Sequence, residues 1–296
     1  MLSRRTRALG ALVLLATSLG AIPLIVREDI PWPELVASRV WLGALTLLSL
    51  LAVRRQLRFP SSHRVEIIFA GVLFAIHWAA LFWAIKLTTV AVALAVVYLG
   101  PVAAAVLAPR LLGERVPRRM YGALGISFFG LLLVVVREST GETLSSGSTL
   151  GGTLAALVSA AALAALMLVS KAAVDEVPPL VVTAGELATA AIVLSPWLPG
   201  AIRETVAHPL PLLTLGIVLT GFSYLIIWTA IRELSVAAVG VMLHIEPISA
   251  VLLAMVFLDE VPQPLQWLGI GLVISGGLMA ARHATREDVL TAPANL

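Results

Sequence analysis

The sequence predicts an all-α membrane protein with ten transmembrane helices arranged as two inverted five-helix repeats. Composition is the first reason. Hydrophobic residues make up 59% of the 296 residues and charged residues only 12%, with a mean hydropathy of +1.00. A soluble domain contains about 25% charged residues, so this composition is not that of a soluble globule. The second reason is the number of long uncharged stretches, and the third is an internal repeat.

The uncharged stretches give the expected elements in chain order. A helix rises about 1.5 Å per residue, so about 20 apolar residues cross a hydrocarbon core about 30 Å thick. The connectors are short and polar, or carry proline or glycine, and they leave no room for a second soluble domain. We expect a polar, disordered cytoplasmic tail at residues 282–296. We expect helices at residues 8–26, 34–53, 66–86, 90–109, 119–137, 149–171, 180–198, 210–231, 236–257 and 263–281.

The basic residues predict the orientation, because cytoplasmic connectors retain Lys and Arg. With the N-terminus inside, 15 basic residues fall in cytoplasmic segments, and one more, Arg39, lies within a span. The sequence therefore predicts a multi-pass protein of the cytoplasmic (inner) membrane, N-in and C-in. Residues 1–21 also have features of a cleavable signal peptide, but cleavage would leave nine spans and break the repeat. The external segments hold four basic residues: Arg27, Lys86, Arg137 and Arg203.

Composition and motifs also argue against several classes of function. The formal net charge is +3, but the basic residues form short clusters between apolar runs, so no nucleic-acid-binding face is expected. The absence of cysteine excludes thiolate metal sites, disulfides and cysteine nucleophiles. The sequence has no phosphate-binding loop and no histidine pair at helical spacing. We expect neither a metal nor a cofactor.

The second half of the chain repeats the first after a shift of 146 residues. Each half contains five predicted spans, and an odd number forces the second half to enter the membrane from the opposite side. Inverted repeats of this kind can expose a central site alternately to either face. The alternative is that the duplication only builds a stable bundle. The matches are Ala84-Ile85-Lys86 with Ala230-Ile231-Arg232, Thr89-Val90-Ala91 with Ser235-Val236-Ala237, Pro33 with Pro179, Pro101 with Pro247, and Glu114 with Glu260.

Two of the repeated stretches resemble a known family. Gly100-Pro101 leads to Leu112-Gly113-Glu114-Arg115, and its copy Glu246-Pro247 leads to Leu258-Asp259-Glu260, each followed by a glycine-bearing span. This pattern is similar to the paired EamA domains of the drug/metabolite transporter superfamily. The resemblance implies two five-helix repeats, at residues 8–137 and 149–281, cytoplasmic termini, and export of small metabolites or amino acids.

The chain departs from that family pattern in its first span. Many members carry a Trp-Gly pair there, whereas this chain reads Ser18-Leu19-Gly20. It also lacks the acidic residue that small multidrug-resistance relatives use in their first helix for proton and drug binding. An antiport mechanism copied from those relatives is therefore not supported.

Polar residues of four predicted spans lie at one depth. His77 lies about 16 Å from the cytoplasmic end of its span, close to the membrane midplane. Ionisable groups at that depth are costly and mark a pathway or a site, although a buried histidine can also simply bond a neighbouring helix. Glu246 binds a substrate ammonium or couples protons in one interpretation, and makes a structural hydrogen bond in the other. The candidate substrate-binding residues are His77, Trp78, Tyr98, Ser223, Tyr224, His244 and Glu246.

Two further pairs are candidates for conformational roles. Pro101 and Pro247 lie inside predicted helices, where a missing N–H and ring clash bend the helix, so they are hinge candidates or plain packing features. Arg39 and Glu186 lie at depths about 13 Å apart, so we expect two separate gates rather than a salt bridge. Arg39 snorkelling to the outer interface is the alternative.

Glycines in the fifth and tenth spans are interpreted as positions of close helix packing. They are Gly122, Gly125, Gly130, Gly269, Gly271 and Gly276.

These features predict a secondary transporter that exports small metabolites, above all amino acids or related amines, by alternating access. The expected partners are a small-molecule substrate, protons and the lipid bilayer. Sugar phosphates are disfavoured, because they would need clustered Lys or Arg at the midplane. One alternative is an uncoupled facilitator or channel. Another is an intramembrane serine hydrolase built on Ser223 with His77 or His244, although its Gly-x-Ser element lacks the second glycine.

Overall fold

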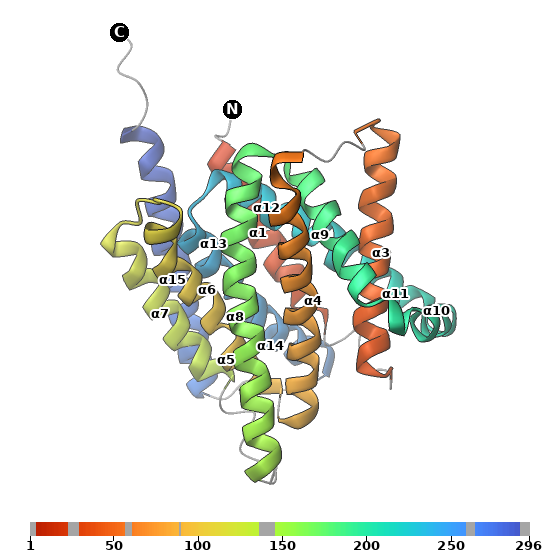
Figure 1. Cartoon of the computed structure of the whole chain (residues 1–296). Coiled ribbons are helices and arrows are strands. Elements are labelled where there is room, and N and C mark those ends of the chain that lie inside the picture. The colour runs from red at the N-terminus through yellow and green to blue at the C-terminus, as the bar shows by residue number, and fades with distance from the viewer. Residues whose placement is uncertain are drawn as a thin grey trace.

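A computed structural model describes residues 4–22, 30–56, 61–88, 90–135, 146–258 and 264–290, which form helices and short connections and contain no strand (Figure 1). The all-helical class is therefore confirmed. One segment, η4 (Thr214–Phe222), is a π-helix, and η1 (Ser61–His63) and η3 (Ser195–Trp197) are 3-10 turns. The α-helices are α1 (Arg4–Leu19), α3 (Trp32–Val53), α4 (Arg64–Leu87), α5 (Val90–Val97), α6 (Leu99–Leu111), α7 (Arg118–Val135), α8 (Ser146–Glu176), α9 (Pro179–Val193), α10 (Leu198–Ala207), α11 (Pro209–Leu213), α12 (Ser223–Glu233), α13 (Val236–Leu243), α14 (Ile245–Leu258) and α15 (Pro264–Leu290).

Seven helical stretches of the described residues are long and apolar enough to cross a membrane, and the bent pair α9 and α10 makes eight if counted as one span. Helices α1 and α7 have 16 and 18 residues, fewer than the roughly 20 of a typical span. The predicted ends of both spans, at residues 23–26 and 136–137, lie outside the described residues, as does Glu260 of the repeat. The protein is thus a multi-pass helical membrane protein, and the ten-span arrangement stays a prediction.

Three predicted boundaries need correction. The helix expected at 180–198 ends at Val193, and the chain then bends by 64° into α10. Pro196 and Pro199 at this corner lack the N–H groups that a continuous helix needs. Helix α8 runs on to Glu176, since no helix breaker precedes Pro178. Helix α15 continues to Leu290 through residues with no proline or glycine, so most of the expected disordered tail is helical.

Two long helical stretches break at corresponding places. The break between α5 and α6 lies at Tyr98, and the break between α13 and α14 lies at His244. Each precedes a proline by three residues, Pro101 in one half and Pro247 in the other. A proline cannot donate to the carbonyl one turn earlier, so a break at this distance is its expected consequence.

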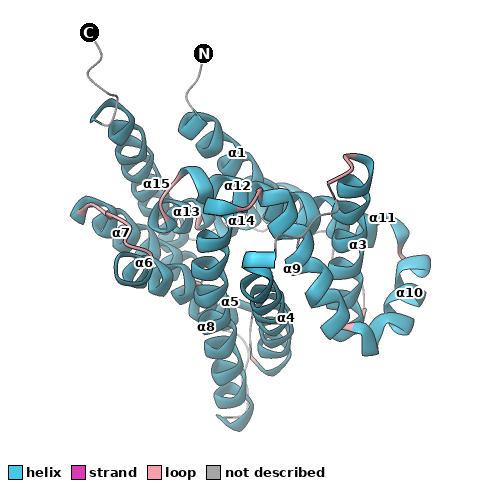
Figure 2. Cartoon of the chain, turned by 45° about the horizontal axis from the view of Figure 1, so that its top comes forward, coloured by secondary structure: helices cyan, strands magenta, loops and turns pink. Residues whose placement is uncertain are grey.

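The packing places α4 in the middle of the bundle, against α8 and α9, while α7 and α15 pair at one side and α3, α10 and α11 lie at the other (Figure 2). Close approach of α7 and α15 needs two of the predicted packing glycines. A Cβ on Gly130 would lie 2.7 Å from the Gly269 carbonyl oxygen, and one on Gly276 would lie 2.7 Å from the Ala123 carbonyl oxygen. A Cβ on Gly125 or Gly271 would meet nothing within 4 Å among the described atoms, so these two are not packing positions.

Candidate substrate cavity

A cavity of about 90 Å³ lies in the interior of the bundle, and we call it the central cavity. Residues of both halves of the chain line it, from α3 and α4 to the breaks at Tyr98 and His244. Aliphatic side chains form most of its wall. The other lining residues are Arg39, His77, Trp78, Tyr98, Pro101, Ser223, Tyr224 and Glu246. Six of the seven predicted substrate-binding residues therefore meet in one place, although their predicted role stays a prediction.

A direct contact joins the two halves at this cavity. The indole Nε1 of Trp78 donates a hydrogen bond to the Tyr224 hydroxyl at 3.1 Å. The two residues are 146 positions apart, which is the shift that relates the repeats. A residue that touches its own counterpart lies where the two halves meet. Phe74 extends the aromatic cluster, with its ring centroid 4.5 Å from that of Tyr224.

Arg39 is buried and lies beside this aromatic pair. Its guanidinium carbon stands 3.5 Å from the centroid of the Trp78 ring, and its Nε donates to the Thr220 hydroxyl at 3.0 Å. The π-helix η4 supplies that hydroxyl, whose own hydrogen is donated to the Leu215 carbonyl oxygen five residues earlier. Among the described residues, the two terminal nitrogens Nη1 and Nη2 have no hydrogen-bond partner. The sequence did not identify Thr220 as a partner of Arg39. A π-helix has an extra residue per turn, and hydropathy does not reveal it.

Glu246 is the carboxylate of the central cavity. The Tyr98 hydroxyl, also at the cavity wall, donates a hydrogen bond to it. The carboxylate is not a hydrogen-bond partner of the Arg39 terminal nitrogens. The cavity therefore carries one cationic and one anionic group that do not neutralise each other directly.

Glu186 is fully buried and lies away from the cavity wall. Its carboxylate accepts hydrogen bonds from the Ser170 hydroxyl at 2.5 Å and from the Trp228 indole at 2.6 Å. Each carboxylate oxygen thus has a donor inside the bundle. Arg39 lies at the cavity and Glu186 between helices, so no salt bridge joins them. Their assignment to two gates stays a prediction.

The two buried histidines share one local arrangement. The Ser159 hydroxyl lies 2.9 Å from His77 Nδ1 and donates to the His77 carbonyl oxygen at 2.9 Å. The Ser127 hydroxyl lies 2.9 Å from His244 Nδ1. His77 also lines the cavity, whereas His244 packs between helices with its ring centroid 5.4 Å from that of Tyr98. A histidine that bonds a neighbouring helix is the alternative that the sequence left open.

Ser223 is at the cavity wall, but its hydroxyl donates to the Val218 carbonyl oxygen at 2.9 Å. Neither histidine is its hydrogen-bond partner in the described residues. A serine nucleophile needs a base within hydrogen-bond reach, so this geometry does not favour the hydrolase alternative.

The hinge candidates differ in position. Pro101 lines the cavity, and its Cβ would lie 3.1 Å from a Cβ placed on Gly240 of α13. Pro247 is buried in the packing around α14 and is not among the lining residues described. Pro101 is therefore the one whose bend shapes the cavity directly.

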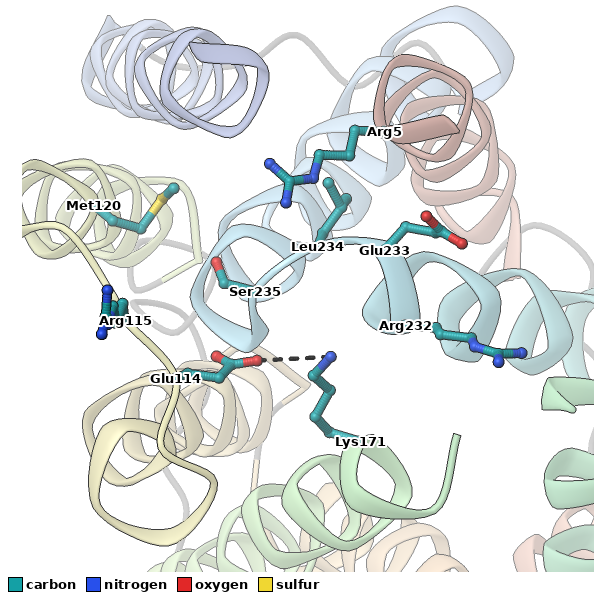
Figure 3. A pocket seen from close by; sticks show the side chains of 9 residues that line it. All are labelled: Arg5, Glu114, Arg115, Met120, Lys171, Arg232, Glu233, Leu234 and Ser235. Atoms are coloured by element: carbon teal, nitrogen blue, oxygen red, sulfur yellow. Dashed lines mark ion pairs between the residues drawn. The ribbon is translucent and has the colours of Figure 1, made fainter. Parts of the chain in front are cut away.

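A second, charged pocket of about 200 Å³ lies at the end of the bundle where α1 begins (Figure 3). We call it the terminal pocket. The Glu114 carboxylate lies 3.9 Å from Lys171 Nζ and accepts a hydrogen bond from the Val236 backbone N–H at 3.1 Å. Lys171 in turn contacts Asp175 at 2.8 Å. The lining residues are Arg5, Glu114, Arg115, Met120, Lys171, Arg232, Glu233, Leu234 and Ser235.

An all-helical bundle with membrane-spanning helices and a mixed polar and aromatic cavity at its centre is the architecture of a membrane transporter. The chain belongs to the EamA-like transporter family, whose profile matches residues 7–136 and, a second time, residues 150–282. Family membership fits the architecture and makes an enzymatic role the less favoured alternative.

Curated relatives agree with this membership, and a solved structure shares the fold. An uncharacterized transporter of Bacillus subtilis, YwfM, is 27% identical over 92% of each chain. The threonine/homoserine exporter RhtA of Escherichia coli K12 is 28% identical over 86% of this chain and 84% of its own length. A solved crystal structure at 21% identity superimposes with a TM-score of 0.78, covering 97% of this chain and 100% of that chain. That likeness shows the shared fold.

Proposed function

We propose that the protein is a secondary transporter that exports small amino acids or related amines across the cytoplasmic membrane by alternating access. The observation that carries the proposal is the central cavity, where Arg39 and Glu246 place opposite charges on a wall of aromatic and aliphatic side chains. A small zwitterion complements both charges, and Glu246 either holds its ammonium or exchanges a proton against it. The name of the relative RhtA, an amino acid exporter, supports the same substrate class.

The proposal includes ten spans in two inverted repeats. The two family matches support it, and so do the helix contacts, which recur when the halves are exchanged. Helix α4 packs on α8 as α12 packs on α1, α6 packs on α8 as α14 packs on α1, and α4 packs on α9 as η4 packs on α3. The breaks before Pro101 and Pro247 correspond in the same way. Such symmetry is what an exchange of conformations between the halves requires.

The proposed orientation, N-in and C-in, rests on the basic residues. The start of α1, η1, the connector from α6 to α7 and the connector from α12 to α13 all lie at the same end of the molecule (Figure 1). Single cysteines at Ser61 and Arg203, both exposed, test it in a chain that has no other cysteine. We expect an impermeant thiol reagent to label Arg203→Cys from outside intact cells and Ser61→Cys only after permeabilisation. The reverse pattern would reject the orientation.

Reconstitution into liposomes tests the function itself. We expect preloaded amino acid to drive counterflow of labelled L-threonine or a related small amino acid, and an imposed pH gradient to drive its accumulation. An uncoupled facilitator, the second candidate, would show the same counterflow and ignore the gradient. A panel of amino acids, amines and nucleosides in which none exchanges would overturn the proposal.

A further inference from the structure

Arg39 is held in a fixed position at the wall of the central cavity. From this we draw one more inference, which rests on the proposed function. The side chain is only 1% exposed. Trp78 covers one face of the guanidinium plane at 3.5 Å, and Thr220 occupies Nε. The guanidinium group is thus held in one place by two residues from different helices, which fixes the direction of its remaining donors.

Those remaining donors have no partner in the protein. Nη1 and Nη2 are both buried and have no hydrogen-bond partner in the part of the chain that the structure describes. A guanidinium group remains charged at all physiological pH values, and burying its N–H donors unpaired is costly. Buried polar groups almost always have partners, so a pair of unsatisfied donors at a cavity wall indicates a ligand.

The shape of the donor pair identifies the ligand chemistry. Two terminal guanidinium nitrogens form a planar fork that matches the two oxygens of a carboxylate in a bidentate contact. The other charged group of the cavity, Glu246, repels a carboxylate and attracts an ammonium. The cavity volume of about 90 Å³ limits such a ligand to a small compound.

We propose that Arg39 Nη1 and Nη2 bind the carboxylate of the transported compound, while Glu246 with Tyr98 faces its amine. The substrate is then a compound that carries both groups, an amino acid, and simple amines are excluded. Trp78 and Thr220 serve as positioning residues for the guanidinium group. The contact between Trp78 and Tyr224 makes the same anchor sensitive to the relative position of the two halves.

Three matched compounds test the assignment in proteoliposomes: L-threonine, L-threoninamide and 1-amino-2-propanol. The second replaces the carboxylate by a neutral amide, and the third lacks it. For the parental protein we expect an apparent KM for threonine roughly 10- to 100-fold below those of the other two, the range for a charge-assisted contact. Arg39→Gln raises the KM for threonine by a similar factor and leaves the amide and amine within about twofold, so the preference disappears.

Two further variants keep the test decisive. Arg39→Lys retains the positive charge but lacks the two parallel N–H donors, so it should show only part of the preference for threonine over the amide and the amine. If Arg39→Gln does not fold, Arg39→Lys tests the carboxylate assignment in its place. Arg203→Gln removes an exposed arginine outside the cavity and leaves all three KM values unchanged. Folding is checked by size-exclusion elution in detergent.

The outcomes separate the two proposals. If threonine is transported but the amide is taken up equally well, or if the preference survives in the Arg39 variants, the carboxylate assignment is wrong and the proposed function stands. If none of the three compounds nor any other amino acid is transported by the parental protein, the proposed function fails and the assignment fails with it.

Discussion

The central cavity and the terminal pocket both contain positive and negative side chains, but the two regions differ in whether these side chains have partners within the protein. In the terminal pocket Glu114 contacts Lys171 and the Val236 backbone, and Lys171 contacts Asp175. In the central cavity Arg39 offers two nitrogens without a partner among the described residues. Charges that are satisfied by the protein join its segments, whereas charges left unsatisfied at a cavity wall are available to a ligand.

The two regions also differ in how strongly their charges act. The side chains of Lys171 and Glu114 are 11% and 12% exposed at the end of the bundle, whereas Arg39 is 1% exposed in the interior. Water and salt therefore reach Lys171 and Glu114 more readily than Arg39 and weaken their attraction more. Changes in the central cavity should therefore alter transport strongly, and changes in the terminal pocket should alter stability modestly.

Apart from the Arg39 variants, the largest expected effect is that of Glu246→Gln. Glutamine keeps the shape and the acceptor for the Tyr98 hydroxyl but removes the charge and the exchangeable proton. We expect normal insertion, retention of some equilibrium exchange, and a loss of pH-driven threonine accumulation of at least about tenfold, since a hydrogen bond to a charged group contributes about 1.5–3 kcal/mol. Accumulation and counterflow in proteoliposomes measure the two activities separately. Normal proton-driven accumulation would leave Glu246 as a structural partner within the bundle.

A smaller effect is expected at the helix breaks, and it should differ between the halves. Pro101→Ala should lower turnover several-fold with little change in expression, because this proline lines the central cavity. Pro247→Ala should lower it less, since its ring lies in the helix packing. Initial rates at saturating substrate, normalised to protein in the vesicles, measure both. Parental rates in both variants would make the two prolines packing features.

The sequence predicted the all-helical class and the bends near the two prolines, and its placement of the polar residues at one depth stays a prediction. Depth follows from counting residues along a span, but the direction in which a side chain points does not. Counting placed Arg39 near the outer end of its span but could not show that its side chain turns onto Trp78 at the cavity. The π-helix that brings Thr220 to Arg39 shifts the helical register, and hydropathy carries no sign of it. Contacts between helices that are distant in the sequence, such as that of Ser127 with His244, can also be identified only from the three-dimensional structure.

The smallest expected effects lie in the terminal pocket. Glu114 accepts from the backbone N–H at the first position of α13, while Ser235 accepts from the Ala238 N–H of the same turn. Glu114→Ala leaves one of these donors without its acceptor and should reduce the free energy of unfolding by about 1 kcal/mol, as the loss of a helix cap does. Thermal unfolding in detergent measures this loss.

Two matched variants divide that loss into its parts. Glu114→Gln keeps an oxygen for the Val236 N–H and removes the negative charge that faces Lys171 across 3.9 Å, so most of the stability should return. Asp175→Asn removes the carboxylate that contacts Lys171 at 2.8 Å. The Asp175 side chain is 48% exposed, and an exposed ion pair contributes about 0–1 kcal/mol, so the loss of stability should be in that range. All three variants should keep the KM for threonine within about twofold. If Glu114→Gln raised that KM as much as Arg39→Gln does, the terminal pocket would bind substrate too, and the distinction between the two regions would be wrong.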